Sequence, residues 1–415
     1  MSVLRPFKAY RPAKELAAKV AAPPYDVLNT EEAREFVKGN PYSFLHVDKA
    51  EIDMEPGIEP KSTPVYEKAR DNLYSMIEKG IYIHDEKPCF YIYTLEREGK
   101  AQRGIVACAS IDEYIEGKIK KHENTLAAQE QDRINHVDYC NANTGPIFLA
   151  YKGKLEINQI LDDWQKDHDP VYDFVSEDNV RNICHVIDDD AVIAKLAELF
   201  KGVDSLYIAD GHHRNASAVK VGLKKREENP DYTGEEEFNF YLCVVFPKDE
   251  LTIIDYNRAV TDFAGNTADE FIEKLRDEFE VSPITDEKSI RPEARGEYAF
   301  YTEGKWYRLK AKNTDTIADP VKKLDVSVLQ DRVLDKLLGI KDPRNDDRVV
   351  FIGGARGLEE LTRLVDSGEM KGAFALYPTS MDELMEIADL GRNMPPKSTW
   401  FEPKLKSGIF IHTLD

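Results

Sequence analysis

Hydrophobic residues along the chain follow two spacings, one typical of helices and one typical of strands. Apolar positions three or four apart predict helices over residues 65–79, 125–141, 155–166, 190–200 and 268–278. Short runs of β-branched and aromatic residues predict strands over residues 89–95, 104–111, 146–151, 183–187, 205–209, 240–246 and 251–254. Because strands alternate with helices, the pattern indicates an α/β protein, and strands that follow one another directly indicate a mixed sheet.

The last third of the chain opens with a hairpin. Residues 298–309 place β-formers on both sides of a Glu-Gly turn, which predicts two paired strands. Beyond residue 324, helices alternate with strands predicted at 349–352, 373–377 and 409–413. We therefore expect an α/β domain over residues 1–285, a β-hairpin segment over 286–323 and a C-terminal α/β segment over 324–415.

Charge narrows the range of partners. The 415 residues include 77 acidic and 56 basic side chains, which gives a net charge of −21. Such a charge repels phosphate backbones and anionic lipids, so we expect neither nucleic acid nor a membrane as a partner. The net negative charge is still compatible with a small anionic ligand that binds together with a divalent cation.

Cysteine usage and the amino terminus indicate the compartment. The five cysteines are widely spaced and form no CxxC pair, which argues against a disulfide framework and against a cysteine zinc site. The first residues lack the pattern of a signal peptide, and no apolar stretch approaches the ~18 residues of a membrane span. We expect a cytoplasmic protein with buried, reduced cysteines.

The strongest candidate for chemistry is the segment DGHHRN, which follows the strand at 205–209 and opens a helix. A strand that turns tightly into a helix presents backbone N–H groups and the positive end of the helix dipole to an anion. Gly211 allows a phosphate to approach the backbone, and Arg214 with His212 and His213 adds donors. Asp210 is a candidate Mg²⁺ ligand. An Asp N-cap followed by surface histidines would give the same pattern.

A second candidate is KKHENT, which precedes the helix predicted at 125–141. Here Glu123 is a candidate metal or water ligand and His122 a candidate phosphate donor, while the helix itself carries Arg133 and His136. The alternative is that Asn124 or the next threonine simply caps the helix. Neither the HExxH pattern of a zinc protease nor the G-x-S-x-G elbow of a serine hydrolase is present.

Two proline-rich segments also carry polar groups. In MPPKSTWFEPK, prolines stiffen a loop that presents Lys397, Ser398 and Thr399, a cation and two hydroxyls suited to a phosphate or a carboxylate. In APPYD, two prolines precede Asp26, a candidate general base. An ordered surface loop and an exposed turn, respectively, are the alternatives. A glycine-rich turn at residues 353–357 is a weaker phosphate candidate.

Four motifs in order resemble one known family. They are KxxAPPYDV, HE-T followed by DR, LYIADGHHR, and MPPKSTWFEPK-x-x-SG. Together they look like the bacterial and archaeal domain-of-unknown-function 1015 family, over nearly the whole chain. The DGHHR box is similar, more distantly, to the nucleotide-phosphate box of the ParB/sulfiredoxin superfamily, which includes free-serine kinases.

The resemblance implies a nucleotide site and a kinase that phosphorylates free L-serine to O-phosphoserine with ATP or ADP and Mg²⁺. It implies that Gly211, His212, His213 and Arg214 grip the nucleotide phosphates. The kinase base corresponds loosely to Asp26.

The residues themselves suggest the remaining roles. Glu123 and Asp210 compete with Asp26 as the base and are the candidate Mg²⁺ ligands, and His213 is a further catalytic candidate. We expect additional nucleotide contacts from His122, Arg133 and Asn215, and we expect Lys397, Ser398 and Thr399 to bind the substrate.

Two other functions stay open at this point. One is a ParB-like switch that binds and hydrolyses nucleotide, and the other is a metal-dependent phosphohydrolase built on Asp210 and nearby histidines. Phosphoryl transfer needs positioned cations, a metal and an orienting base, and the candidate motifs contain all three. The oligomeric state, monomer or homodimer, is left open.

Overall fold

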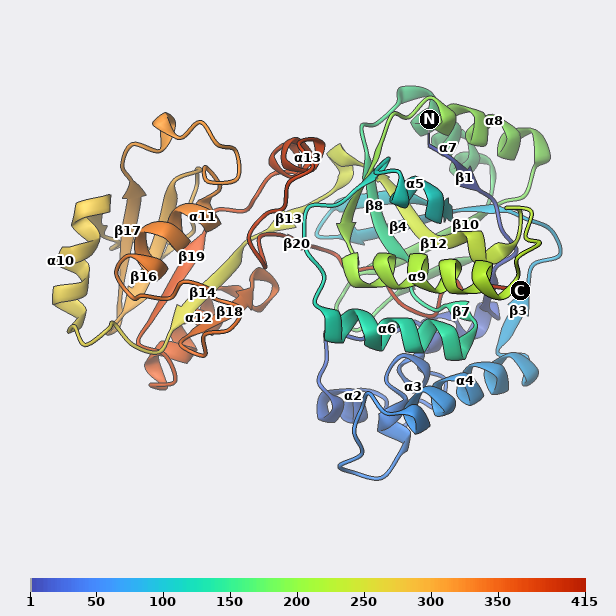
Figure 1. Ribbon diagram of the computed structural model, residues 1–415, viewed down its shortest axis with the longest axis horizontal. Helices are drawn as coiled ribbons and strands as arrows, with labels where there is room; N and C mark the ends of the chain where they lie inside the picture. Colours follow the sequence, from blue (N-terminus) through green and yellow to red (C-terminus); the bar gives the residue numbers. More distant parts are fainter. Residues whose placement is uncertain (1) are drawn as a thin grey trace. The chain divides into compact units, whose positions relative to one another are not determined.

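The computed structural model describes residues 2–415, and these residues divide into two compact units (Figure 1). Unit 1 comprises the described residues through Lys121 together with Thr125–Leu251 and Pro403–Asp415. Unit 2 comprises His122–Asn124 and Thr252–Glu402. The carboxyl-terminal segment therefore returns to the unit that contains the amino-terminal half of the chain.

Unit 1 is built on a mixed sheet. Along the sheet the strands run in the order β6 (Ile119–Lys120), β11 (Leu206–Asp210), β8 (Ile147–Tyr151), β12 (Phe240–Pro247), β5 (Lys100–Ser110), β4 (Phe90–Arg97), β10 (Arg181–Ile187) and β9 (Tyr172–Val175), with β1 (Leu4–Arg5) also paired to β5. The pairs β11–β6 and β12–β8 are parallel, and the others are antiparallel. The predicted mixed α/β sheet is thus confirmed.

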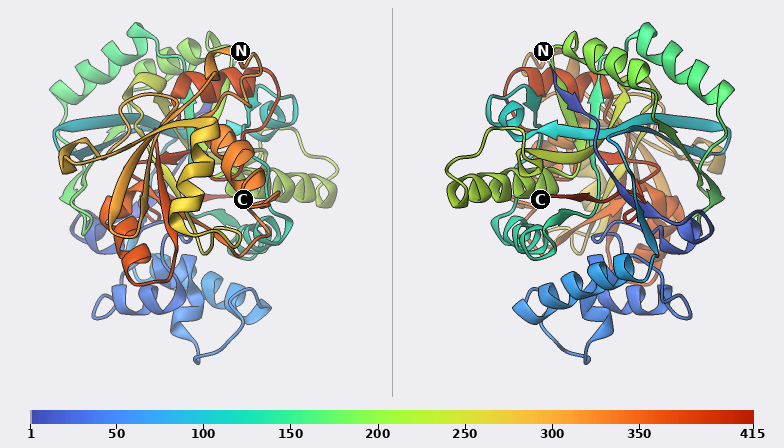
Figure 2. Two further views of the ribbon diagram at one scale, coloured as in Figure 1. Left: turned by 90° about the vertical axis from the view of Figure 1, so that its left-hand side faces the viewer. Right: turned by 90° about the vertical axis from the view of Figure 1, so that its right-hand side faces the viewer.

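The helices of unit 1 cover this sheet and a second core. They are α1 (Ala17–Val20), α2 (Thr30–Phe36), α3 (Leu45–Asp48), α4 (Thr63–Glu78), α5 (Ile111–Ile115), α6 (Ala127–Cys140), α7 (Leu155–Asp167), α8 (Asp190–Lys201) and α9 (His212–Glu228). Apolar faces of α7, α8 and α9 pack on the sheet. Helix α6 lies beside α9 and α4, and the segment from α2 to α4 encloses a smaller core (Figures 1 and 2).

Short strands tie distant parts of unit 1 together. Strand β2 (Tyr10–Pro12) pairs with β3 (Tyr82–His84), and β21 (His412–Thr413) pairs with β7 (Ala142–Asn143). An isolated bridge joins Ala22 to Ser407, which fixes the last residues of the chain beside the APPYD segment.

Unit 2 is built on an antiparallel sheet. Its strands run in the order β15 (Phe279–Pro283), β17 (Lys305–Ala311), β16 (Glu297–Thr302), β19 (Gly372–Leu376), β14 (Tyr256–Val260) and β18 (Val349–Gly353). A separate pair joins β13 (Ile253–Ile254) and β20 (Trp400–Phe401). The helices are α10 (Ala268–Glu278), α11 (Asp325–Leu329), which continues as a π-helical segment over Gln330–Asp335, α12 (Gly357–Asp366) and α13 (Met381–Asp389).

Local signals account for many of these elements. Capping boxes begin α10 at Thr267 and α13 at Ser380. In each box the N-cap hydroxyl accepts the backbone N–H of a glutamate three residues later, and the carboxylate of that glutamate accepts the backbone N–H of the N-cap residue. The predicted hairpin forms β16 and β17. The predicted last strand at 409–413 shortens to β21, since Ile411 makes only an isolated bridge to Tyr10.

The predicted boundaries near residues 285 and 324 both lie inside unit 2. Strand β14 precedes both positions and pairs with β18 and β19, which follow them. One sheet therefore joins all three predicted parts.

The remaining sequence expectations concern cysteines and membranes. All of Cys89, Cys108, Cys140, Cys184 and Cys243 are buried and none forms a disulfide within the described residues. Among residues 2–415, no helix combines the length and the apolar character needed to cross a bilayer.

Candidate functional site

The DGHHRN turn, residues 210–215, joins β11 to α9 in unit 1. Strand β11 is antiparallel to β8, and its register shifts between Ile208 and Asp210, which marks a β-bulge just before the turn. Gly211 then adopts φ 92°, in the left-handed region, and α9 begins at His212. A Cβ on Gly211 would lie 3.1 Å from Nε of Arg214. The turn therefore brings the Arg214 guanidinium against the backbone at the amino end of the helix, where the helix dipole favours anions.

The carboxylate of Asp210 lies between two cations. Its Oδ2 is 3.1 Å from Nζ of Lys404 and 4.0 Å from Nη2 of Arg214. Burial raises the pKa of the Asp210 carboxyl, but the charges of Lys404 and Arg214 outweigh this effect and hold the pKa well below its usual range. Asp210 is ionised at neutral pH, and the three side chains together carry one net positive charge.

Arg214 also borders a narrow cleft within unit 1. Its Nη1 donates a 2.6 Å hydrogen bond to the carbonyl of Pro146, and Gly145 lies against the same group. The cleft has about 30 Å³ of water-accessible volume, roughly the room of two or three water molecules. We call it the unit 1 cleft, and its polar lining includes Tyr25, Asp48, Arg133, His136, Thr144 and Arg214.

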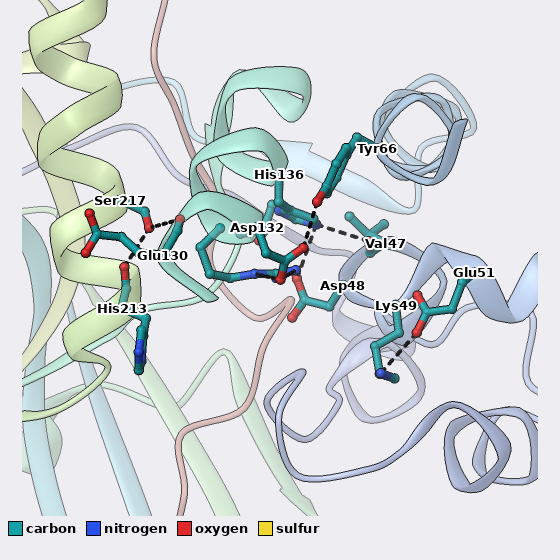
Figure 3. A network of polar contacts seen from close by, with 12 residues as sticks. Val47, Asp48, Lys49, Glu51, Tyr66, Glu130, Asp132, His136, His213 and Ser217 are labelled. Atoms are coloured by element: carbon teal, nitrogen blue, oxygen red, sulfur yellow. Dashed lines mark hydrogen bonds and ion pairs between the residues drawn. The ribbon is translucent and has the colours of Figure 1, made fainter. Parts of the chain in front are cut away.

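Helix α6 contributes a second cation to this cleft. The guanidinium of Arg133 stacks over the ring of Tyr25 with its carbon 4.0 Å from the ring centroid, and its Nη2 lies 2.9 Å from Oδ2 of Asp132. The other oxygen of Asp132 accepts a 2.9 Å hydrogen bond from the hydroxyl of Tyr66 (Figure 3). Arg133 is thus held in place from two sides while it lines the cleft.

Asp48 places a buried carboxylate opposite these cations. Its Oδ1 accepts a 3.0 Å hydrogen bond from Thr144 Oγ1 and lies 3.9 Å from Nε2 of His136. His136 Nε2 also donates to the carbonyl of Val47 at 3.2 Å (Figure 3). Burial lowers the pKa of the His136 imidazole, and the charge of Arg133 adds to this effect. His136 is therefore neutral at neutral pH and acts as a donor to the backbone.

His213 has a local structural partner. Its Nε2 accepts a 3.0 Å hydrogen bond from the backbone N–H of Leu126, so that nitrogen carries no proton in this arrangement. Its carbonyl accepts from Ser217 Oγ at 2.7 Å, and the same hydroxyl lies 3.0 Å from the carbonyl of Glu130 in α6 (Figure 3). His213 and Ser217 thereby connect the start of α9 to α6.

The structure distributes the other predicted site residues unevenly. Asp26 is exposed in a turn and follows Tyr25, which lines the unit 1 cleft. Asn215 is fully buried, and its amide donates to the hydroxyl of Tyr241 at 3.1 Å. His122 and Glu123 belong to unit 2, where the carbonyl of His122 accepts the N–H of Met394 at 2.7 Å.

The Lys-Ser-Thr loop also belongs to unit 2. The hydroxyl of Ser398 donates to the carbonyl of Pro395 at 2.6 Å, and the carbonyl of Ser398 accepts from Thr379 at 2.9 Å. Lys397 adopts φ 56°, and its carbonyl accepts from Arg258 at 2.9 Å. The Ser398 side chain therefore stabilises the loop itself, while Thr399 follows it toward β20.

Sequence reasoning missed several residues of unit 1. Asp48 and Thr144 stand in segments without a recognisable motif, so no sequence signal identifies them. Tyr25 and Lys404 lie within the motifs APPYD and MPPKSTWFEPK, but nothing in these motifs indicates a role for either side chain. The pairing of Ala22 with Ser407 explains how the segment that begins at Pro403, and contains Lys404, comes to lie in the same unit as the APPYD motif.

The chain is similar in sequence to one protein family. The family described as "Protein of unknown function (DUF1015)" matches residues 4–327. A comparison with curated proteins gave no match.

Several solved structures match weakly. A conserved hypothetical protein from Pyrococcus furiosus is 19% identical over 74% of this chain and 94% of its own, with a TM-score of 0.34. A free serine kinase in complex with AMP is 16% identical over 74% and 91%, with a TM-score of 0.35. A C-terminally truncated SbnI from Staphylococcus aureus is 11% identical over 73% and 85%, with a TM-score of 0.37. Because these TM-scores lie below 0.5, the likenesses carry no conclusion about activity.

Proposed function

The chain belongs to the DUF1015 family, and from that premise and the geometry of unit 1 we propose that it is a small-molecule kinase that transfers a phosphoryl group from ATP or ADP to the hydroxyl of free L-serine. The observation that carries the proposal is the DGHHRN turn. There, a helix amino end, the Arg214 guanidinium and Lys404 meet around an ionised Asp210.

The turn suits the phosphates of a nucleotide. Backbone N–H groups at the start of a helix and a guanidinium together form a site for phosphate oxygens. Gly211 lacks the Cβ that would obstruct their approach. Phosphoryl transfer depends mainly on such positioning and on neutralisation of charge, because the protein itself contributes little covalent chemistry.

The neighbouring unit 1 cleft suits the head of an amino acid. Arg133 and Arg214 supply cations for its carboxylate, and buried Asp48 supplies a carboxylate for its ammonium group. Its water-accessible volume of about 30 Å³ is far below that of a nucleotide pocket, so the cleft would admit only a small polar group. Because Arg214 borders both the turn and the cleft, donor and acceptor would meet beside it.

Magnesium would enter with the nucleotide. One carboxylate of unit 1 fits this ion. Asp210 is ionised, and both of its ion pairs are made by Oδ2, so Oδ1 is the oxygen that would hold the ion. Mg²⁺ commonly keeps several waters and binds one or two carboxylates with substrate phosphates. The ion would neutralise charge on the transferred group. Glu123, which belongs to unit 2, stays a candidate Mg²⁺ ligand from the sequence alone.

The remaining roles are proposed from sequence. Asp26, beside Tyr25, is the proposed base that orients the serine hydroxyl, in competition with Glu123 and Asp210. Lys397 and Thr399 are proposed substrate contacts. His212 is a proposed phosphate contact, and His213 is proposed to hold the turn against the start of α6 through Leu126.

A pair of substitutions on one helix tests the proposal. Arg214→Met removes the guanidinium from the turn, whereas Arg226→Met removes an equally shielded guanidinium of α9 that pairs with Asp112. We expect Arg214→Met to lower turnover by about 100-fold or more, and Arg226→Met to leave it within about twofold, in a coupled assay of serine phosphorylation. Equal activity of the two variants would remove the turn from the active site.

A further inference from the structure

A second polar cleft lies entirely within unit 2. It has a volume of about 300 Å³, which is in the range of small-molecule sites. Its lining includes Arg258, Gln330, Lys341, Arg344 and Pro396. The cleft is lined by three cationic side chains and one carboxylate, that of Asp342, although the chain as a whole carries a net charge of −21. We call it the unit 2 cleft.

Arg258 is the unusual residue of this cleft. It lies in the middle of β14, between β18 and β19, and only 4% of its surface is exposed. Its guanidinium donates to backbone carbonyls, at 2.8 Å to Tyr256 and 2.9 Å to Lys397, and its carbon lies 4.4 Å from the ring centroid of Phe351.

No carboxylate balances this charge. Among the described residues, the partners of the Arg258 guanidinium are carbonyl oxygens and aromatic rings, with no acidic side chain at ion-pair distance. Burial lowers the pKa of Arg258 to about 9, opposed only by the phenol of Tyr256. A buried cation without a counter-ion is costly, and an anion in the cleft would relieve that cost.

The other walls of the cleft add charge and a fixed shape. Lys341 is exposed and adds a second cation, whereas Arg344 is neutralised by Asp342 at 2.7 Å. Gln330 begins the π-helical segment and donates to the carbonyl of Ile340 at 2.7 Å, which holds the chain just before Lys341. Departures from α-helical geometry of this kind are frequent at functional sites.

We propose that the unit 2 cleft binds a small dianion of the phosphate-monoester class, held by the Arg258 guanidinium and Lys341. Two uncompensated positive charges match a dianion better than a single carboxylate. The volume of about 300 Å³ leaves room for a small organic group attached to the phosphate. This inference does not depend on the proposed kinase activity, because no residue that lines the unit 2 cleft has a role in that proposal.

The test measures the affinity of the full-length chain for inorganic phosphate by titration calorimetry at about 0.15 M salt, where weak surface attraction is largely screened. Every protein carries Arg214→Met, which removes one of the two cations of the DGHHRN turn and so weakens phosphate binding there. To this background we add Lys341→Gln, or Lys305→Gln as the control, since Lys305 is an exposed lysine of unit 2 outside the cleft.

We expect saturable phosphate binding in the Arg214→Met protein, competed by sulfate and not by chloride. Lys341→Gln should weaken it by about 10-fold, the loss of one charge-assisted contact, and Lys305→Gln by less than about twofold. Arg258→Met should abolish it, with circular dichroism used to confirm that this variant folds.

Two outcomes would overturn the proposal. One is the absence of saturable binding in the Arg214→Met protein, and the other is equal affinity of the Lys341 and Lys305 variants. Failure of the proposed kinase activity would instead appear as a lack of phosphoserine in the protein with native Arg214. A tighter affinity for glycerol phosphate than for inorganic phosphate would show that the organic group is also recognised.

Discussion

At the scale of single residues, the geometry of the DGHHRN turn depends on Gly211. Its φ of 92° is costly for a residue with a side chain, and a Cβ there would lie 3.1 Å from Nε and Nη2 of Arg214. Gly211→Ala should therefore displace the guanidinium as well as strain the backbone. Gly234 has φ 97° with open space around it, so Gly234→Ala reproduces the strain alone.

We expect both glycine variants to lose about 1–2 kcal/mol of unfolding free energy in urea denaturation. Only Gly211→Ala should also lower turnover, by about tenfold or more, because small displacements of positioning groups have large effects on rate. A Gly211→Ala protein with full activity would mean that the position of Arg214 does not matter for catalysis.

Lys404 provides a second prediction at this scale. With Lys404 present, the turn carries one net positive charge, and Lys404→Met reduces this to zero because Asp210 then balances Arg214. We expect nucleotide affinity to fall by about 10- to 100-fold in a calorimetric titration with ADP.

Lys406 supplies the matched control for this prediction. It is also shielded and pairs with Asp178 at 2.7 Å, so Lys406→Met removes a similar ion pair elsewhere in unit 1. Its nucleotide affinity should stay within about twofold of the native protein. A similar loss in both variants would indicate a general effect on folding.

The sequence identified part of this site for physical reasons. A strand, a glycine and a helix are encoded locally, so the DGHHRN turn was predictable from adjacent residues. Asp48 and Thr144 meet His136 only through tertiary contacts, and nothing in their own segments indicates this. The role of Asp26 as base and the ParB/sulfiredoxin likeness stay predictions.

At the scale of elements, α6 and α9 position the unit 1 cleft together. Helix α6 supplies Arg133 and α9 supplies Arg214, and the Ser217 hydroxyl lies between backbone carbonyls of both helices. The helices predicted at 125–141 and after the DGHHRN segment match α6 and α9, although most of the buried residues of α6 are polar. Periodicity could not predict which helices would be neighbours, since that depends on the sheet order β11–β8–β12.

The start of α11 gives a pH-dependent prediction for unit 2. Burial raises the pKa of Asp325 to about 7, although the N–H of Gly296 donates to its carboxylate oxygens at 2.9 and 3.1 Å. The reference value is 3.8, so the folded chain binds this proton more tightly than the unfolded chain. The stability contributed by protonated Asp325 is therefore fully present below about pH 4 and is lost as the pH rises to about 7.

Asp325→Asn should remove this dependence. We expect the native protein to lose up to about 4 kcal/mol of unfolding free energy from this group between pH 4 and 7, and the variant to lose correspondingly less. Urea denaturation at several pH values measures the slope, and Asp331→Asn, at an exposed position of the π-helical segment, is the control. Parallel pH profiles for all three proteins would mean that Asp325 does not cause the pH dependence of stability.

At the scale of the whole molecule, the chain forms two units with two cationic clefts on an acidic background. The net charge of −21 disfavours nucleic acid, whereas the local charges of Arg133 and Arg214 in one unit and Arg258 in the other favour small anions. The fold class could be predicted because strands alternate with helices. The division into units could not, because residues from both sides of the predicted boundaries pair within one sheet.

The central claim is phosphoryl transfer to serine, and phosphorus NMR tests it most directly. The full-length protein would be incubated with Mg²⁺ and L-serine, with ATP in one sample and ADP in another. We predict that the resonance of O-phosphoserine grows as the terminal phosphate of one donor disappears, and that Arg214→Met suppresses this growth while Arg226→Met does not. Release of inorganic phosphate without phosphoserine, or a nucleotide left unchanged in both samples, would contradict the account.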